Sequence, residues 1–189
     1  MKNIIINQIQ ESIDTKKNLI NLCLDDIQYA AELMIDCVNN KGKILWCGNG
    51  GSAADAQHLS TELMGGMMNK ERKPIPSIAL TTDTSFLTAW TNDTDFDSIF
   101  SRQVQAIGIE NDILVGISTS GKSENVINAI KQAKFKNLKT IFLTGENENL
   151  NNIADLIINV PSSNTQRIQE SHIMIGQILC SLLEANLIN

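Results

Sequence analysis

Apolar positions along the chain follow two different patterns, and the change comes near residue 41. In residues 1–40 they recur every three to four positions, which is the spacing of one buried face of a helix. The clearest set is Ile27, Ala30, Ala31, Met34, Ile35 and Val38. A polar break near Asn18 to Asp26 divides this region. The sequence therefore predicts two helices before the rest of the chain.

From residue 41 onward, short apolar runs alternate with segments of helical pattern. The runs predict strands at Lys43–Cys47, Pro76–Leu80, Asp112–Ser118, Lys139–Thr144 and Asp155–Val160. Helices are expected between and after them, at 52–65, 84–92, 97–107, 123–136, 146–154 and 165–187. The strands are apolar throughout, as a parallel sheet covered on both faces requires. We expect an α/β fold, a three-layer αβα sandwich around a five-stranded parallel sheet, with ligands at the carboxyl ends of the strands.

Composition adds a domain count and several exclusions. With 189 residues and 42% hydrophobic residues, the chain is expected to form one domain, 1–189, with its own core. The net charge is −6 and only three of the 15 basic residues are arginine, which argues against a nucleic-acid surface. No apolar run approaches the roughly 18–20 residues of a membrane span, and Met1 to Gln10 does not resemble a signal peptide. The four cysteines lie in apolar stretches and indicate buried free thiols, so we expect a cytoplasmic protein.

A glycine-rich loop follows the first predicted strand, at 48–52. Glycines let the backbone approach a ligand, and the next helix offers free N–H groups to an anion. Ser52 and Asp55 also fit a capping box, which would explain part of the pattern. The run Gly48-x-Gly50-x-x-Ala53 formally fits a dinucleotide fingerprint, but the next predicted strand leads to an acidic residue only at Asp83, later than such a site requires.

A loop rich in hydroxyl groups follows the third predicted strand. Residues 116–123 match the G-x-x-x-x-G-K-[ST] pattern of a nucleotide-binding P-loop. Against that interpretation, the apolar run continues through Ile117, and the next strand ends in Thr144-Gly145 rather than in a metal-binding aspartate. The loop carries hydroxyls at Ser118, Thr119, Ser120 and Ser123. These favour a site for a single phosphate group, and plain helix capping by Ser120 or Ser123 is the alternative.

The helix predicted at 52–65 carries possible metal ligands. His58 and Glu62 are four positions apart, so they share one face. Such a pair can hold a divalent metal such as zinc, and the carboxylate can act as a base. An exposed pair of this kind is more often a solvated contact, but this helix begins at a candidate ligand loop. In the last helix, Gln169 and Gln177 share a broad side, and His172 points about 140° away from Gln177.

Together these motifs resemble the sugar isomerase (SIS) domain family, and within it the phosphoheptose isomerases. The resemblance covers essentially the whole chain. Its motifs are Gly48-Asn49-Gly50-Gly51-Ser52 with His58 and Glu62, Asn92-Asp93, Phe100-Ser101-Arg102-Gln103-Val104, Ile117-Ser118-Thr119-Ser120-Gly121 and Arg167-Ile168-Gln169-Glu170. The family usually has asparagine at the position of Lys122, which suggests that the P-loop match arises from one substitution.

The resemblance implies an activity and a role for each motif. Phosphoheptose isomerases interconvert sedoheptulose 7-phosphate and D-glycero-D-manno-heptose 7-phosphate, toward the heptose of bacterial lipopolysaccharide. The phosphate would be held by Ser118, Thr119, Ser120 and Ser123, and the rest of the substrate by Asn49, Gly50, Gly51, Glu62, Asn92, Asp93 and Gln169. Zinc (Zn2+) would be bound by His58, Glu62 and Gln169, with Glu62 also the catalytic base. Family members are homotetramers, which implies that residues 1–40 are a helical oligomerisation segment.

The chain departs from the family pattern at two positions. A second histidine, which binds zinc and serves as acid or base, is usual eight residues after Gln169, and this chain has Gln177 there. An amide is a poorer zinc ligand than imidazole and no acid at neutral pH. The family also tends to have an arginine at the position of Gly66, for which Arg72 is a candidate substitute.

Two other functions remain open at this stage. Non-catalytic SIS proteins of the DiaA type bind the replication initiator DnaA and lack the catalytic glutamate. The presence of Glu62 argues against that function, while Gln177 argues slightly for it. Another sugar-phosphate isomerase is the second alternative.

Overall fold

Five parallel strands form one sheet in the computed structural model, which describes residues 1–147, 150 and 152–187. The strands are β1 (Ile44–Gly48), β2 (Ser77–Ala79), β3 (Ile113–Ser118), β4 (Lys139–Gly145) and β5 (Leu156–Val160). Their order is β2-β1-β3-β4-β5, and each pair of neighbours is parallel. This is the flavodoxin-like order, whose switch point lies between β1 and β3. The predicted five-stranded parallel sheet is confirmed.

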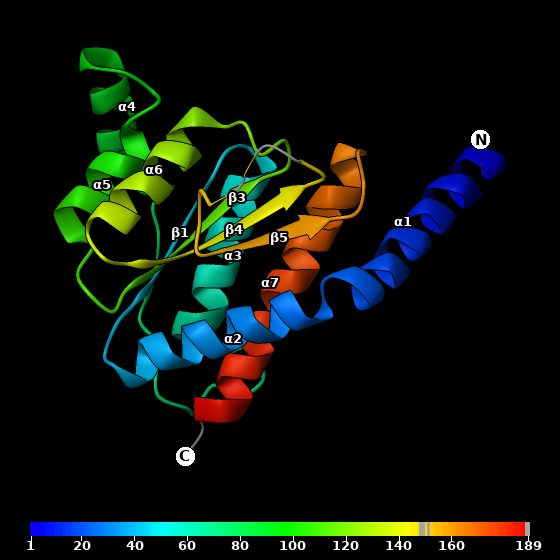
Figure 1. Ribbon diagram of the computed structural model, residues 1–189, viewed down its shortest axis with the longest axis horizontal. Helices are drawn as coiled ribbons and strands as arrows, with labels where there is room; N and C mark the ends of the chain where they lie inside the picture. Colours follow the sequence, from blue (N-terminus) through cyan, green and yellow to red (C-terminus); the bar gives the residue numbers. More distant parts are fainter. Residues whose placement is uncertain (148–149, 151, 188–189) are drawn as a thin grey trace.

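Helices cover both faces of the sheet and make the expected three layers (Figure 1). They are α1 (Lys2–Leu22), α2 (Leu24–Asn39), α3 (Gly51–Gly65), α4 (Thr84–Asp93), α5 (Ile99–Ile107), α6 (Glu124–Phe135) and α7 (Thr165–Leu187). The helices α2, α3 and α7 pack on one face, and α5 and α6 pack on the other. Because each strand-to-helix loop leaves the same edge of a parallel sheet, the loops after β1 and β3 lie side by side.

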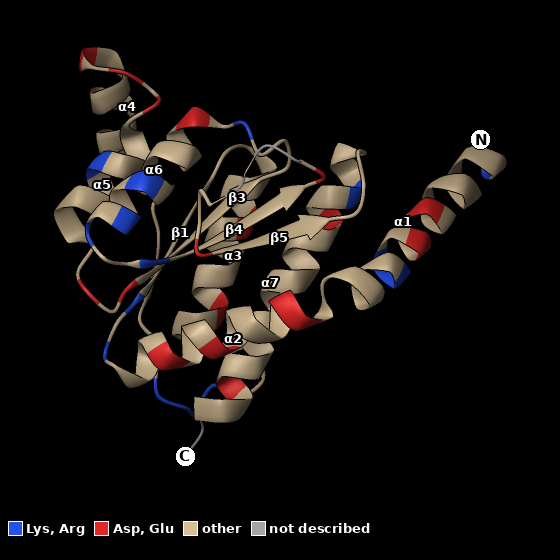
Figure 2. Cartoon of the chain, in the orientation of Figure 1, with Lys and Arg blue, Asp and Glu red and all other residues tan. Residues whose placement is uncertain are grey.

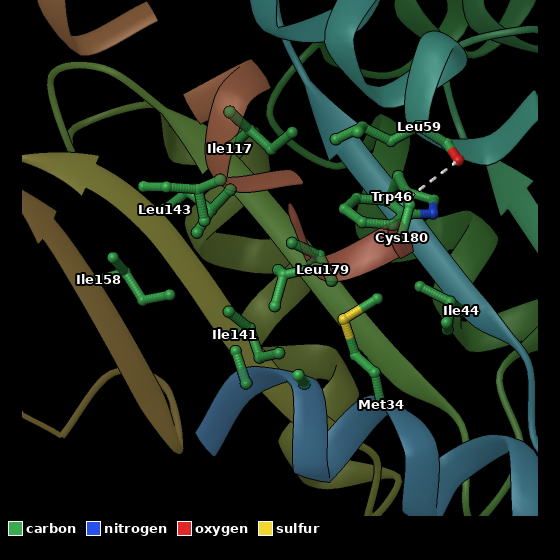
Figure 3. Packing of buried hydrophobic residues seen from close by; sticks show 14 of the residues in the cluster. Met34, Ile44, Trp46, Leu59, Ile117, Ile141, Leu143, Ile158, Leu179 and Cys180 are labelled. Atoms are coloured by element: carbon green, nitrogen blue, oxygen red, sulfur yellow. Dashed lines mark hydrogen bonds between the residues drawn. The ribbon is translucent and has the colours of Figure 1, made fainter. Parts of the chain in front are cut away.

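Side chains of the strands alternate between two apolar cores. Ile44 and Trp46 of β1 belong to the core under α2, α3 and α7, and Leu45 and Cys47 belong to the core under α5 and α6. Figure 3 shows the first core, where Leu179 of α7 lies among strand residues. All five of these residues are fully shielded from solvent. Burying each large apolar side chain contributes about 1.5–3 kcal/mol, so both faces of the sheet hold the helices in place.

The two N-terminal helices meet at Cys23, inside the polar break that the sequence predicts. The Cys23 thiol donates a hydrogen bond to the Asn159 carbonyl at 3.3 Å and ties this joint to β5. Beyond the joint, α1 extends away from the sheet as an arm (Figure 1). Its exposed large apolar side chains are Ile4, Ile5, Ile6, Ile9, Ile13, Ile20 and Leu22. All four cysteines are buried and free, as expected.

The prediction of a helix at 146–154 is wrong for the residues that the structure describes. Glu146, Asn147, Leu150 and residues 152–154 form bends, turns and irregular backbone, while residues 148, 149 and 151 lie outside the described chain. Asn152 has a φ of 64°, a left-handed value that a helix does not accommodate. Leu150 and Ala154 are nevertheless buried. Their helix-like apolar spacing therefore reflects two contacts with the core, not a helical turn.

Charged residues of both signs are interspersed along the helices and loops (Figure 2). Within the described residues, no helix is long and apolar enough to cross a membrane.

Candidate active site

The glycine-rich loop joins β1 to α3 through a sharp turn. Gly50 has a φ of 56°, which favours glycine, and a Cβ on Gly48 would lie 2.8 Å from the Ser52 Cβ. The helix is capped at Gly50 with no side-chain hydrogen bond, so the predicted capping box of Ser52 and Asp55 is wrong. Ser52 and Asp55 are instead used for contacts with α7.

An amide pair joins this loop to α6. Asn49 Nδ2 donates to Asn125 Oδ1 at 2.8 Å, and Asn125 Nδ2 donates back to Asn49 Oδ1 at 2.9 Å. Asn125 is buried and also accepts a hydrogen bond from the Val126 backbone N–H. The pair locks the loop after β1 to the loop after β3. No sequence motif indicates Asn125, because the contact joins residues 76 positions apart.

The hydroxyl-rich loop gathers three serines at the N-terminus of α6. Ser118 Oγ lies 2.9 Å from Ser123 Oγ and 3.5 Å from Ser120 Oγ. Ser123 occupies the cap position without a side-chain capping bond, whereas Ser120 Oγ accepts from the Lys122 backbone N–H at 3.2 Å. Thr119 and Ser120 line an open pocket that also reaches Thr165. Clustered hydroxyls at a helix N-terminus suit a phosphate group.

The third cluster lies between α3 and α7. His58 Nε2 is 2.9 Å from Glu62 Oε1, and Gln177 Nε2 is 3.4 Å from His58 Nε2 and 3.3 Å from Glu62 Oε1. The Glu62 side chain is 14% exposed and that of His58 is 51% exposed. Glu62 Oε2 is buried and has no hydrogen-bond partner among the described residues. Since a buried carboxylate oxygen ordinarily has a partner, the unpartnered Oε2 marks Glu62 as a candidate for binding a further group.

Gln169, in the first turns of α7, contacts the N-terminal turns of α3. Its Nε2 donates to Asp55 Oδ2, and its Oε1 accepts from Ser52 Oγ at 3.4 Å. Among the described residues Gln169 makes no hydrogen bond to His58 or Glu62, which lie further along α3 and are reached by Gln177 instead. A Cβ on Gly51 would lie 2.9 Å from Gln169 Oε1, so glycine is needed for this close approach. Burial raises the pKa of Asp55 to about 6, although the hydrogen bond from Gln169 and the charge of His58 lower it.

Three of the expected groups do not join these clusters. Asn92 and Asp93 are exposed at the end of α4, where Asn92 Nδ2 donates to Asp93 Oδ1 at 2.8 Å. Figure 1 shows α4 projecting from the far side of the sheet, away from α3 and α7. Arg72 is no substitute for an arginine at position 66, because its side chain is buried and paired with Glu184. Gly66 itself has a φ of 89°, and a Cβ there would lie 2.6 Å from the Asn69 carbonyl oxygen.

The donor set around Glu62 fits a divalent cation, with weak ligands. No group of three or more His, Cys, Asp and Glu side chains is found in the described part of the chain. The donors gathered at Glu62 are the His58 imidazole, the Glu62 carboxylate with its unpartnered Oε2 and the amide of Gln177. The expected ligand Gln169 is bonded to Asp55 and Ser52 instead. His172 lies outside this cluster: it is fully buried, and burial lowers its pKa to about 4.

The chain is a three-layer α/β domain that belongs to the SIS domain family, whose model matches residues 8–145. Its relatives within that family are phosphoheptose isomerases. The one from a Nitratiruptor species is 52% identical over 159 residues, which is 84% of each chain. The one from Aliarcobacter butzleri is 45% identical over 188 residues, which is 99% of each chain.

Solved structures agree with this assignment. Phosphoheptose isomerase from Neisseria gonorrhoeae has a TM-score of 0.90 at 43% identity, over 97% of this chain and 98% of that chain. Phosphoheptose isomerase from Francisella tularensis has a TM-score of 0.92 at 40% identity, over 97% of both chains. The close homologues are thus phosphosugar isomerases, a class of enzymes.

Proposed function

We propose that this protein is a sedoheptulose 7-phosphate isomerase that forms D-glycero-D-manno-heptose 7-phosphate, a precursor for lipopolysaccharide heptose. The observation that carries the proposal is the buried, unpartnered Glu62 Oε2 beside His58, in a chain whose full-length relatives are phosphoheptose isomerases.

Substrate binding begins at the hydroxyl-rich loop. Ser118, Thr119, Ser120 and Ser123 hold the phosphate with the N-terminal N–H groups of α6. The sugar then extends toward Asn49, Gly50 and Gly51, because the amide pair places the two loops side by side. Asn92 and Asp93 contact a sugar only if α4 faces the site of a neighbouring subunit.

Glu62 acts as the base of the isomerisation. Aldose–ketose exchange removes a proton from the carbon beside the carbonyl, forms an enediol and returns a proton to the neighbouring carbon. Glu62 Oε1 lies within hydrogen-bond distance of His58 and Gln177, and these two contacts fix the direction of the carboxylate for the proton transfer. Low exposure of the carboxylate keeps competing water away from the proton transfer.

Zinc is the proposed cofactor, bound by His58, Glu62 and Gln169. Bound there, the metal would polarise the carbonyl oxygen of the sugar. Because Gln177 replaces an imidazole, we expect the affinity for zinc to be lower than in a site with a second histidine.

The exposed isoleucines of α1 support a homotetramer in which residues 1–40 contact other subunits. A cytoplasmic location is proposed from the four free thiols.

The test is to incubate the purified protein with sedoheptulose 7-phosphate, with and without added zinc, and to identify the product by NMR. Formation of the aldoheptose phosphate is expected. No turnover in either condition, together with binding to the initiator protein DnaA, would contradict the proposal and favour the DiaA-type function.

A further inference from the structure

A buried ion pair lies beyond the cluster of His58, Glu62 and Gln177, near the C-terminal end of α3. Arg72 Nε donates to Glu184 Oε2 at 2.8 Å, and the two side chains are only 4% and 3% exposed. Arg72 lies in the segment after α3, and Glu184 lies in the last turns of α7. The pair therefore joins the segment that follows the Glu62 helix to the helix that carries Gln177.

Glu184 is the acceptor at the centre of this network. Besides Arg72, it accepts hydrogen bonds from the backbone N–H groups of Met67, Met68 and Asn69 at 2.8, 2.8 and 2.7 Å. Burial alone would raise the pKa of Glu184, but these hydrogen bonds outweigh it and lower the pKa to about 2. The carboxylate is charged at neutral pH and fixes the loop that follows α3.

Arg72 links the network directly to the backbone of the catalytic residue. Its Nη2 donates to the Glu62 carbonyl oxygen at 2.9 Å, and its Nη1 donates to the Lys73 carbonyl at 2.9 Å. The Glu62 carbonyl also accepts from the Gly66 N–H at the end of the helix. The guanidinium thus holds the backbone of Glu62 from one side.

The side chain of Glu62 is held by the same helix, α7, from the other side. Gln177 and Glu184 are seven residues apart, so they lie on one face of α7, two turns from each other. Gln177 contacts the Glu62 carboxylate, and Glu184 holds Arg72, which contacts the Glu62 backbone. Two contacts from one rigid helix therefore fix both the position and the direction of this residue.

We propose that Arg72 and Glu184 are positioning residues for the Glu62 carboxylate, an inference that rests on the proposed isomerase activity. A well-packed apolar pair would stabilise a buried helix contact at least as well as an ion pair does. An apolar pair could not bind the Glu62 carbonyl and three loop N–H groups in fixed directions. The pair accordingly sets the geometry of proton abstraction, while the distant hydroxyl-rich loop sets phosphate binding.

The experiment compares Arg72→Lys and Glu184→Gln with a matched control. Asp112→Asn is suitable, because Asp112 is a buried carboxylate just before β3 that accepts from Lys43 Nζ and from the N–H groups of Lys43 and Ile109, and it contacts neither Glu62 nor Arg72 among the described residues. Steady-state kinetics are measured on folded protein at a temperature where all variants are native. We expect Arg72→Lys and Glu184→Gln to lower kcat about 10- to 100-fold with KM within about 3-fold of wild type. The control should keep the wild-type kcat.

Each outcome decides a different claim. Variants that fold and keep the wild-type kcat, or that lose kcat no more than Asp112→Asn, overturn the positioning role. If Arg72→Lys does not fold, the comparison of Glu184→Gln with the control decides. A wild-type protein without turnover of sedoheptulose 7-phosphate overturns the proposed function and the positioning role with it.

Discussion

Gly176 of α7 lies directly against Leu59 of α3, so closely that a Cβ at position 176 would come within 2.3 Å of Leu59 Cδ1 and 2.6 Å of Cδ2. Leu59 is fully buried, so moving its side chain aside would disturb the core around it. Each of these residues neighbours a site residue, Gln177 and His58 respectively. The close approach of the two helices is therefore what lets Gln177 reach His58 and Glu62.

Gly176→Ala is expected to push α3 and α7 apart. Overpacking of a filled core costs about 1–3 kcal/mol of unfolding free energy, and the displaced Gln177 should also lower kcat. Urea denaturation and steady-state kinetics measure the two effects. Gly65→Ala is the matched control, because nothing lies within 4 Å of a Cβ there. A Gly176→Ala protein as stable and active as that control would show that the close approach is unimportant.

Ser118→Ala and Ser123→Ala should weaken phosphate binding without affecting proton transfer. A hydrogen bond to a charged group contributes about 1.5–3 kcal/mol, so we expect KM to rise at least about 10-fold with little change in kcat. Inhibition by inorganic phosphate should weaken in parallel. Ser101→Ala serves as the control, since Ser101 Oγ donates to the Ser98 carbonyl on α5. An unchanged KM in both loop variants would show that this loop does not bind the phosphate group of the substrate.

Gln177→His should tighten zinc binding, because it adds an imidazole beside His58 and Glu62. The zinc dissociation constant, measured by competition with a chromogenic chelator, should fall about 10-fold or more. Gln166→His adds a histidine on the exposed start of α7 and should leave the constant unchanged. Equal zinc affinity in wild type and Gln177→His would place the metal elsewhere.

Glu184→Gln should remove a pH-dependent part of the stability. The pKa of Glu184 is lowered from 4.5 to about 2 in the folded state, so its charge stabilises the fold above pH 4.5 and this contribution is lost as the pH falls toward 2. The difference in unfolding free energy between wild type and Glu184→Gln should thus be largest at pH 7 and shrink between pH 4.5 and 2. Urea titrations across that range measure it. If the difference in unfolding free energy stayed constant from pH 7 to pH 2, the charge of the Glu184 carboxylate would not contribute to stability.

Much of the fold follows from local pattern. The continuous apolar runs place all five strands within one or two residues of their observed bounds, because a strand buried on both faces must be apolar throughout. The prediction of a helix at 146–154 is wrong for a different reason. Leu150 and Ala154 are buried, and apolar spacing alone does not distinguish a helix from a buried loop.

The candidate site is less accessible to sequence reasoning. Spacing along α3 places His58 beside Glu62, since an i, i+4 pair depends only on the helix. The contacts of Gln177 with Glu62 and of Asn49 with Asn125 depend on how distant elements pack. The role of Arg72 is set by its burial beside Glu184, which no local pattern shows.

Glu62→Gln is the decisive variant for the proposed base, because it keeps the shape of the side chain and removes its ability to accept a proton. Turnover of sedoheptulose 7-phosphate is measured beside wild type, with binding of the substrate followed separately by calorimetry. We predict a kcat about 10²- to 10⁴-fold lower with substrate affinity within a few-fold of wild type. A Glu62→Gln protein that isomerises the substrate at the wild-type rate would contradict the proposed mechanism.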